Sequence, residues 1–340
     1  MIIVYNKELN NFHELTHAIS VQFEENYNNI GKAILTLPID DYNISIIENG
    51  GIIYDTVRDM SFVIVNHKYD TTRNLITVNA YTCNWLLNKR TITEKTAISN
   101  IESDIYEVVR NNLRGLKNIA LADVKGYENT ADAVLFGGQL LDGIMPILET
   151  AQIGNRMRWD ADNRQHVFEL YKGNDLTEGI HAVVFSEEYK TAKNLTITND
   201  DSVLKNYIYV TGILQDDSEI IVEVGTSEGD ERHERWISSP SRQENNETES
   251  QFRKRLQQIG MEEAAKLVSR KTFSVTIDTA EYGVHYKLGD VISCVSQRFG
   301  VELKSRITSV QYKLDINGEK INLILGEPIL TALGEVKLLG

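Results

Sequence analysis

The chain has few of the residues that mark special classes of protein. It contains four prolines in 340 residues and no low-complexity segment, which predicts a folded chain without long disordered linkers. Its two cysteines, Cys83 and Cys294, stand far apart in apolar, strand-like surroundings. They are therefore expected to be buried free thiols rather than a disulfide framework or a zinc site.

Long apolar runs and an excess of positive charge are also missing. No apolar run reaches the ~18 residues of a membrane span, and the N-terminus lacks the basic and apolar regions of a signal peptide. The formal net charge is −14, and such an acidic surface disfavours stable binding to nucleic acid or to an anionic membrane. The chain is longer than one hydrophobic core supports, so roughly two to four domains are expected.

What the sequence does contain is a clear antiparallel β-meander over residues 273–328. Phe273, Val275 and Ile277 alternate with polar residues, as in a half-buried strand. Two turn signals divide the rest into strands, and the second contains the Asn-Gly pair typical of a β-hairpin. The turn residues are Gly289, Asp290, Asn317 and Gly318. Such a meander is typical of a small β-barrel.

The N-terminal residues 1–92 read as a second copy of this meander. A shift of 238 positions places Leu35, Leu37, Ile39, Gly51 and Ile53 on Phe273, Val275, Ile277, Gly289 and Val291. A shift of 245 places Phe62, Val65, Lys68, Asp70, Ile76 and Val78 on Ile307, Val310, Lys313, Asp315, Ile321 and Leu323. Repeats determine architecture, but any two alternating strand–turn–strand segments align in this way, so the pattern alone leaves both interpretations open.

The middle of the chain is expected to hold insertions between the two barrels. The predicted elements are helices over 100–115, 138–152 and 247–269, and a hairpin with strands over 156–159 and 166–171. The predicted domains are a first β-barrel over 1–92, an α+β insertion over 93–172, a β segment over 173–235 contributing to the second barrel or its neighbour, a helical insertion over 236–270, and the second barrel's strands with a C-terminal tail over 271–340. The fold class expected is mainly β with α+β insertions, with two related small β-barrels plus insertion domains.

One short motif suggests metal chemistry. The string from His13 to His17 satisfies the H-E-x-x-H pattern of a zinc protease helix, with Glu14 as general base. The flanking residues supply barely one amphipathic turn, and no third ligand follows at the usual spacing. A polar loop leading into a strand over 19–25 is the favoured interpretation, and a zinc hydrolase is kept as an alternative.

No other cluster predicts an active site. Asp160 and Asp162 could bind calcium, but the glycine and the distal glutamate of an EF-hand loop are missing, and a solvated hairpin tip is favoured. The Gly-Gly pairs lie outside any phosphate-binding motif. The sequence therefore predicts no catalytic residue, no cofactor and no metal site, and a chain that is not an enzyme.

Several segments together resemble the tail-tip or baseplate hub proteins of tailed bacteriophages, in particular the siphophage hub family of Gram-positive hosts. The resembling segments are NWLLNKRTI at 84–92, VVFS at 183–186, NYIYVTG at 206–212, YKLGDV at 286–291 and SRIT at 305–308. Each is short, but in order they span nearly the whole chain. Members of this family are similar to the myophage baseplate hub, with two related β-barrels plus insertion domains.

The resemblance implies a structural, non-enzymatic protein. It implies a homotrimer whose six barrels form a pseudo-sixfold ring between the tail and its tip, with DNA and the tape-measure protein passing through without specific binding. The implied partners are the distal tail protein ring, the tape-measure protein, and tail fibre or tip and lysin proteins, without a membrane. The implied location is the virion tail tip, after assembly in the host cytoplasm.

Two further expectations accompany the resemblance. Some hub proteins carry long C-terminal peptidase or receptor-binding extensions, whereas this sequence stops at Gly340, so a hydrolase or fibre is expected on a separate chain. The alternative is a receptor- or carbohydrate-binding β protein of the tail tip, for which Trp159, Trp236 and Tyr171 are the candidate residues.

Overall fold

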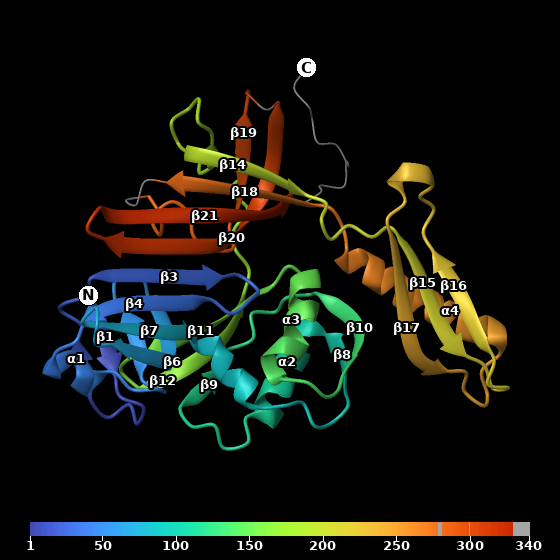
Figure 1. The fold of residues 1–340 in the computed structure, drawn as a ribbon, viewed down its shortest axis with the longest axis horizontal. Helices are drawn as coiled ribbons and strands as arrows, with labels where there is room; N and C mark the ends of the chain where they lie inside the picture. Colours follow the sequence, from blue (N-terminus) through green and yellow to red (C-terminus); the bar gives the residue numbers. More distant parts are fainter. Residues whose placement is uncertain (278–280, 299, 329–340) are drawn as a thin grey trace. The chain divides into compact units, whose positions relative to one another are not determined.

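The computed structural model describes residues 1–277, 281–298 and 300–328. The chain divides into two compact units, which are described separately (Figure 1). The larger unit comprises Met1–Thr196 and Phe273–Gly340, and the smaller unit comprises Ile197–Thr272. The expected C-terminal tail beyond residue 328 lies outside the described residues.

The first meander occupies the N-terminal part of the larger unit. Its strands pair in the order β3-β4-β7-β6-β5-β1-β2, and every pairing is antiparallel. Buried residues alternate along β3, β4 and β7, which explains why these strands form a half-buried sheet. Its elements are β1 Ile2–Tyr5, β2 Phe12–Glu14, β3 Ser20–Asn26, β4 Lys32–Pro38, α1 Asp41–Ile46, β5 Ile52–Asp55, β6 Met60–Asp70 and β7 Leu75–Thr82.

The second meander repeats this order of pairing. Its strands pair in the order β19-β20-β21-β18-β14. This order matches β5-β6-β7-β4-β3 of the first meander, strand for strand. β20 also pairs with β3, so the two meanders form one continuous 13-stranded sheet among the described residues (Figure 1). The elements are β13 Val184–Phe185, β14 Lys193–Asp200, β18 Arg270–Ile277, β19 Val291–Ser296, β20 Val301–Asp315 and β21 Gly318–Pro328.

The two meanders match in strand order, but the residue-by-residue shifts need correction. The shift of 245 places Val78 on Leu323. Val78 pairs with Leu35 in the first meander, and Leu323 pairs with Val275 in the second. Leu35 therefore corresponds to Val275 rather than to Phe273. The shift of 245 fails in the same way for β6, because the hairpin loops differ: Asp70 pairs with Leu75 whereas Asp315 pairs with Gly318. Asp70 therefore corresponds to Lys313 rather than to Asp315.

A glycine turn gives an independent point of alignment. The N–H of Gly50 donates to the Ile64 carbonyl, and the N–H of Gly289 donates in the same way to Ile307. Both glycines have positive φ, +91° and +94°. Gly289 therefore matches Gly50, one residue before the predicted Gly51.

The insertion domain packs beside the first meander. Two expected helices and the expected hairpin are present, and the side chain of Asn100 accepts the Ser103 N–H to cap the first helix. α2 and α3 pack together around a large shared apolar core. The elements are η1 Cys83–Lys89, β8 Thr96–Asn100, α2 Ile101–Asn112, β9 Ile119–Leu121, β10 Thr130–Leu135, α3 Leu140–Thr150, β11 Gly154–Asp160 and β12 Gln165–Tyr171.

The smaller unit is a three-stranded sheet covered on one face by a helix. Its elements are β15 Tyr207–Ile213, β16 Glu219–Val224, η2 Gly229–Glu231, β17 Glu234–Arg242 and α4 Glu249–Lys266. Phe252 and Leu256 of α4 are buried against Ile208 and Val210 of β15. The region 236–270, predicted as a helical insertion, therefore also contains most of the strand β17. This strand pairs in parallel with β15 and extends the sheet that α4 covers.

Both cysteines are free and buried, as predicted. Burial raises the pKa of the Cys83 thiol to about 12 and that of Cys294 to about 11, which leaves both unreactive at neutral pH. None of the helices in the described part of the chain has the length and apolarity that crossing a bilayer requires.

Candidate functional site at a three-way junction

Tyr27 lies where the first meander, the insertion domain and the second meander meet. Its hydroxyl donates to the carbonyls of Gln152 (3.0 Å) and Tyr171 (3.2 Å). The Arg306 guanidinium of β20 lies 4.9 Å from the centre of the Tyr27 ring. One buried side chain therefore contacts all three parts of the larger unit.

Close backbone approach beside Tyr27 explains the glycines found there. A Cβ on Gly173 would lie 1.9 Å from the Gly289 carbonyl oxygen, and a Cβ on Gly289 would lie 2.6 Å from the Tyr27 ring. The adjacent Asp290 is buried, and its carboxylate accepts the backbone N–H groups of Asn174 (2.7 Å) and Lys287 (2.9 Å). The predicted turn at 289–290 thus joins the second meander to the end of the insertion domain.

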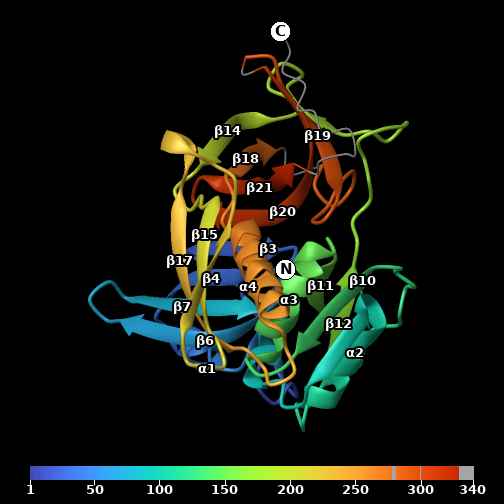
Figure 2. The ribbon, with the colours of Figure 1, turned by 90° about the vertical axis from the view of Figure 1, so that its right-hand side faces the viewer.

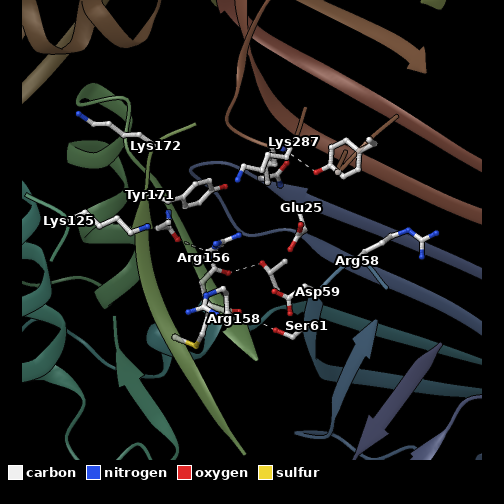
Figure 3. A pocket seen from close by; sticks show the side chains of 18 residues that line it. Glu25, Arg58, Asp59, Ser61, Lys125, Arg156, Arg158, Tyr171, Lys172 and Lys287 are labelled. Carbon is white, nitrogen blue, oxygen red and sulfur yellow. Dashed lines mark hydrogen bonds between the residues drawn. The ribbon is translucent and has the colours of Figure 1, made fainter. Parts of the chain in front are cut away.

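A polar cavity of about 270 Å³ opens beside this joint, and we call it the junction pocket (Figure 3). All three parts of the larger unit contribute to its wall. Its charged lining residues are Glu25, Arg58, Asp59, Lys125, Arg156, Arg158, Lys172 and Lys287. The excess of cations contrasts with the net charge of −14 on the whole chain.

Glu169 on β12 neutralises three of these cations. Its carboxylate accepts hydrogen bonds from Lys125 (2.6 Å), Arg156 (2.8 Å) and Arg158 (3.0 Å). Burial alone would raise the pKa of Glu169, but the contacts with Lys125 and Arg156 outweigh it and hold the pKa at about 2. The carboxylate therefore stays ionised at neutral pH and holds the β11–β12 hairpin to the loop that carries Lys125.

The pKa of Glu25, at the end of β3, is shifted in the opposite direction to that of Glu169. Burial raises the pKa of its carboxyl to about 7; Arg156 lowers it, whereas Asp59 and Asp55 raise it further. Figure 3 shows Glu25, Asp59 and Arg156 around the same pocket. Desolvation of a half-buried carboxylate without a matched cation disfavours its ionised form, which raises the pKa of Glu25.

The pocket's chemistry is that of a structural joint. Four of its basic groups are held by carboxylates of the same unit, three by Glu169 and the fourth, Arg58, by both Asp55 (2.7 Å) and Glu319 (2.6 Å). Asp55 and Glu319 come from different meanders, so Arg58 ties β5 to β21. These contacts align three chain segments.

The predicted metal candidates do not assemble a site. Phe12–Glu14 is a strand, so His13 and His17 lack the one-turn spacing of a zinc helix. Their rings bond instead to Asn11 (3.2 Å) and Thr16 (2.8 Å). Within residues 1–277, 281–298 and 300–328, no three His, Cys, Asp or Glu side chains are grouped as metal ligands.

The Asp160 turn is a hairpin tip between β11 and β12. Its carboxylate accepts the backbone and side-chain N–H groups of Asn163 (3.1 and 2.7 Å), and these bonds lower the pKa of Asp160. Asp162 is exposed beside it. The tip thus has the Asp/Asn turn chemistry that the sequence indicated.

The remaining predicted turn residues set backbone shape. Gly318 has a φ of +94° in the β20–β21 hairpin, and Asn317 donates its N–H to Asp315 (2.7 Å). Gly51 has ordinary φ, but a Cβ there would lie 2.9 Å from the Tyr5 carbonyl oxygen. Gly51 is therefore required by close approach, whereas Gly50 is the residue that adopts the left-handed conformation.

Only one of the three aromatic candidates is exposed. Trp159 and Tyr171 are buried, whereas Trp236 on β17 is 56% exposed. Trp236 stacks on Tyr209 (5.7 Å between ring centres), and Arg232 lies 3.4 Å from the centre of the Tyr207 ring. We call these four residues the aromatic patch; they lie on the face of the smaller unit's sheet that α4 leaves open.

Known structures place this fold among the tail proteins of bacteriophages and prophages. A tail protein from Neisseria meningitidis has a TM-score of 0.58, 9% identity, and coverage of 96% of each chain. The 43 kDa tail protein of prophage MuSo2 from Shewanella oneidensis has a TM-score of 0.58 and 10% identity, covering 96% of this chain and 98% of that one. Prophage tail protein gp18 from Listeria monocytogenes has a TM-score of 0.51 and 17% identity, covering 95% and 94%.

The sequence assigns the family. Residues 1–327 match the Siphovirus ReqiPepy6 Gp37-like proteins, and the chain belongs to that family. None of the functionally curated proteins matches it in sequence. The expected resemblance to phage tail proteins and the mainly β fold class are therefore confirmed.

Proposed function

We propose that the chain is the hub of a siphophage tail tip and acts as a homotrimeric ring. The observation that carries this proposal is the recurrence of one strand order in two meanders that are joined edge to edge through β3 and β20. Three chains with two such meanders each supply six similar units around one axis, a closed symmetry. The ring then joins a sixfold tail to a threefold tip.

The partners follow from this position. The distal tail protein ring lies above, tail fibre or tip and lysin proteins lie below, and the tape-measure protein occupies the channel. The net charge of −14 supports passage of DNA without binding, because an acidic wall repels phosphates. The ring is assembled in the host cytoplasm and ends in the virion tail, without catalysis, a cofactor or a membrane.

The test is the mass and symmetry of the purified protein. Light scattering over a concentration series is expected to give three times the mass of the chain at high concentration. Averaged electron micrographs are expected to show a ring with six similar peripheral densities. A different stoichiometry, or a ring whose lumen is lined by lysines and arginines, would contradict the proposal.

A second function, receptor or carbohydrate binding, is favoured by the aromatic patch. Aromatic faces beside polar groups bind sugars or peptides through ring stacking and hydrogen bonds. Trp236→Ala is expected to weaken binding to host cell-wall polysaccharide at least tenfold, measured by pull-down with purified walls. Tyr189→Ala removes an exposed ring from the other unit and is the matched control. Equal binding by all three proteins would exclude this function.

A further inference from the structure

The wall of the junction pocket has more positive than negative charge. Its six cations are Arg58, Lys125, Arg156, Arg158, Lys172 and Lys287. The carboxyl groups that line the wall or hold these cations number five, and they are Glu25, Asp55, Asp59, Glu169 and Glu319. The pocket therefore has one surplus positive charge, although the whole chain has a net charge of −14.

Three hydrogen-bond donors of the wall are unused. Arg156 gives its Nε and Nη2 groups to Glu169 (both 2.8 Å), whereas its Nη1 group bonds to none of the described residues. The hydroxyl of Tyr171 makes no hydrogen bond within the described ranges, although the side chain is only 8% exposed. Lys287 donates its backbone N–H to Asp290 (2.9 Å), but its Nζ has no partner in the part of the chain that the structure describes. Polar groups on buried side chains normally have a partner, so the Tyr171 hydroxyl points to a ligand.

The three donors come from segments that meet at the pocket. Arg156 lies on β11, and its guanidinium carbon is 4.9 Å from the centre of the Tyr171 ring. Tyr171 ends β12, from which the chain runs to the second meander (Figure 2). Lys287 lies in the second meander, shortly before β19. Figure 3 shows the Tyr171 hydroxyl pointing toward the space between Lys287 and Glu25.

We propose that the junction pocket binds one small oxyanion of the phosphate class, held by Arg156 Nη1, Lys287 Nζ and the Tyr171 hydroxyl. A tetrahedral oxyanion accepts hydrogen bonds from several directions at once, and arginine and lysine supply the charge-assisted bonds by which proteins hold phosphate. The cavity of about 270 Å³ lies just below the ~300–1,000 Å³ of ordinary small-molecule pockets. This size fits a free ion better than a nucleotide or a polymer.

Two carboxyl groups on the wall oppose an anion, and the opposition of each is reduced. Asp59 is exposed to solvent, which screens its charge, and it accepts a hydrogen bond from the Tyr54 hydroxyl (3.0 Å). Desolvation raises the pKa of Glu25 to about 7, so a bound anion draws a proton onto this carboxyl. The protonated carboxyl is itself a donor. Its neutralisation leaves the pocket with two surplus positive charges, which match a dianion.

Calorimetric titration of the full chain with sodium sulfate tests the site. Sulfate has the shape and charge of a phosphate dianion, and its protonation does not change near neutral pH. Sodium chloride keeps the ionic strength constant, because screening alone weakens interactions between charges. One sulfate ion is expected to bind per chain at pH 6, and inorganic phosphate is expected to compete for the same site.

Two substitutions each remove one donor and spare the fold. Tyr171→Phe keeps the ring and loses a hydroxyl that has no partner among the described residues, and Lys287→Met keeps the aliphatic side chain and loses the charge. Each is expected to weaken sulfate binding at least about tenfold, the loss for one hydrogen bond to a charged group. Lys117→Met is the matched control, because it removes an exposed lysine of the same unit outside the pocket. Unchanged urea unfolding in chloride establishes that the variants are folded.

The pH dependence of binding gives a second readout. The charged and titratable groups around Glu25 are Asp55, Arg58, Asp59, Arg156, Arg158, Tyr171, Tyr282 and Lys287. The wild-type affinity for sulfate is expected to fall about tenfold from pH 6 to pH 8, because the anion binds the chain whose Glu25 is protonated. Glu25→Gln is neutral at both pH values and should bind sulfate about equally at both, which assigns the effect to Glu25 rather than to its neighbours.

Several results would overturn the proposal. An absence of binding heat at millimolar sulfate would do so, and so would binding that survives both Tyr171→Phe and Lys287→Met, because the ion then lies elsewhere. If sulfate stabilises the wild type and both donor variants equally, it acts by exclusion from the protein surface. If a short oligothymidylate displaces sulfate and binds more tightly, the pocket takes the phosphates of nucleic acid instead of a free ion. All the residues tested belong to one chain, so these results do not depend on the trimeric ring proposed above.

Discussion

Replacing Glu25 with glutamine is expected to stabilise the larger unit in a strongly pH-dependent manner. The folded pKa of Glu25 is about 7, against 4.5 for an ordinary glutamate, because the half-buried carboxyl loses solvation where it lines the junction pocket. Glutamine has nearly the same shape and does not titrate. The substitution therefore removes the cost of ionising a buried carboxyl while keeping the packing around it.

The sign and the size follow from proton linkage. Below pH 4.5 Glu25 is protonated in both the folded and the unfolded chain, so the two proteins should be about equally stable. Between 4.5 and 7 only the unfolded chain loses the proton, and wild-type stability falls by about 1.4 kcal/mol per pH unit. Above pH 7 the difference is constant, with Glu25→Gln more stable by about 3 kcal/mol.

Urea unfolding between pH 4 and 8 measures this difference. Trp85 and Trp159 belong to the larger unit and report its unfolding, provided that Trp236 of the smaller unit is replaced by phenylalanine in every variant. Glu24→Gln is the control: Glu24 lies near the surface 3.7 Å from Lys32, and losing such a pair changes stability by less than about 1 kcal/mol. A stability difference for Glu25→Gln that stays the same from pH 4 to pH 8 would refute the reasoning.

Four further substitutions test other parts of the structure. Glu169→Gln should lower stability at pH 7 by about 2–3 kcal/mol; because the pKa of Glu169 is held at about 2, the loss should fade as urea titrations move from pH 4.5 toward pH 2. Gly289→Ala should lower the free energy of unfolding by about 2–4 kcal/mol, because the residue has a positive φ and the added Cβ would collide with Tyr27. Gly318 has the same φ but open space around it, so Gly318→Ala should lower the free energy of unfolding by only about 1–2 kcal/mol. Phe252→Ala should remove about 3–5 kcal/mol from the core of the smaller unit, so limited proteolysis should cut within residues 197–272 while the Trp159 unfolding transition is retained.

Local patterns in the sequence were sufficient to predict most elements. The helix capped by Asn100 and the hairpin at Asn317 and Gly318 each depend on contacts within a few residues. The Glu169 cluster could also have been found, because a hairpin turning at 160–164 places Arg156 directly opposite Glu169. Tyr27 and Lys125 gave no such signal, since their partners are distant in sequence and are brought close only by the packing of three chain segments.

The smaller unit was divided wrongly for a related reason. β17 follows a charge-dense loop, and its sequence, ERWISSPSR, has little apolar alternation. A strand of this kind is stabilised by its parallel neighbour β15 rather than by its own pattern. The exposure of Trp236 likewise depends on which sheet face α4 covers, and helical periodicity in α4 does not reveal that choice.

The misaligned repeat shows most clearly what alternation can and cannot determine. Side chains of a strand return to the same face every two residues, so a shift of two keeps every apolar residue inward while changing each of its partners. The shift of 238 erred in this way, placing Leu35 on Phe273 although the ladders match it to Val275. Hydrogen bonds from Gly50 and Gly289 to Ile64 and Ile307 resolve the ambiguity, because they depend on backbone position rather than on side-chain pattern.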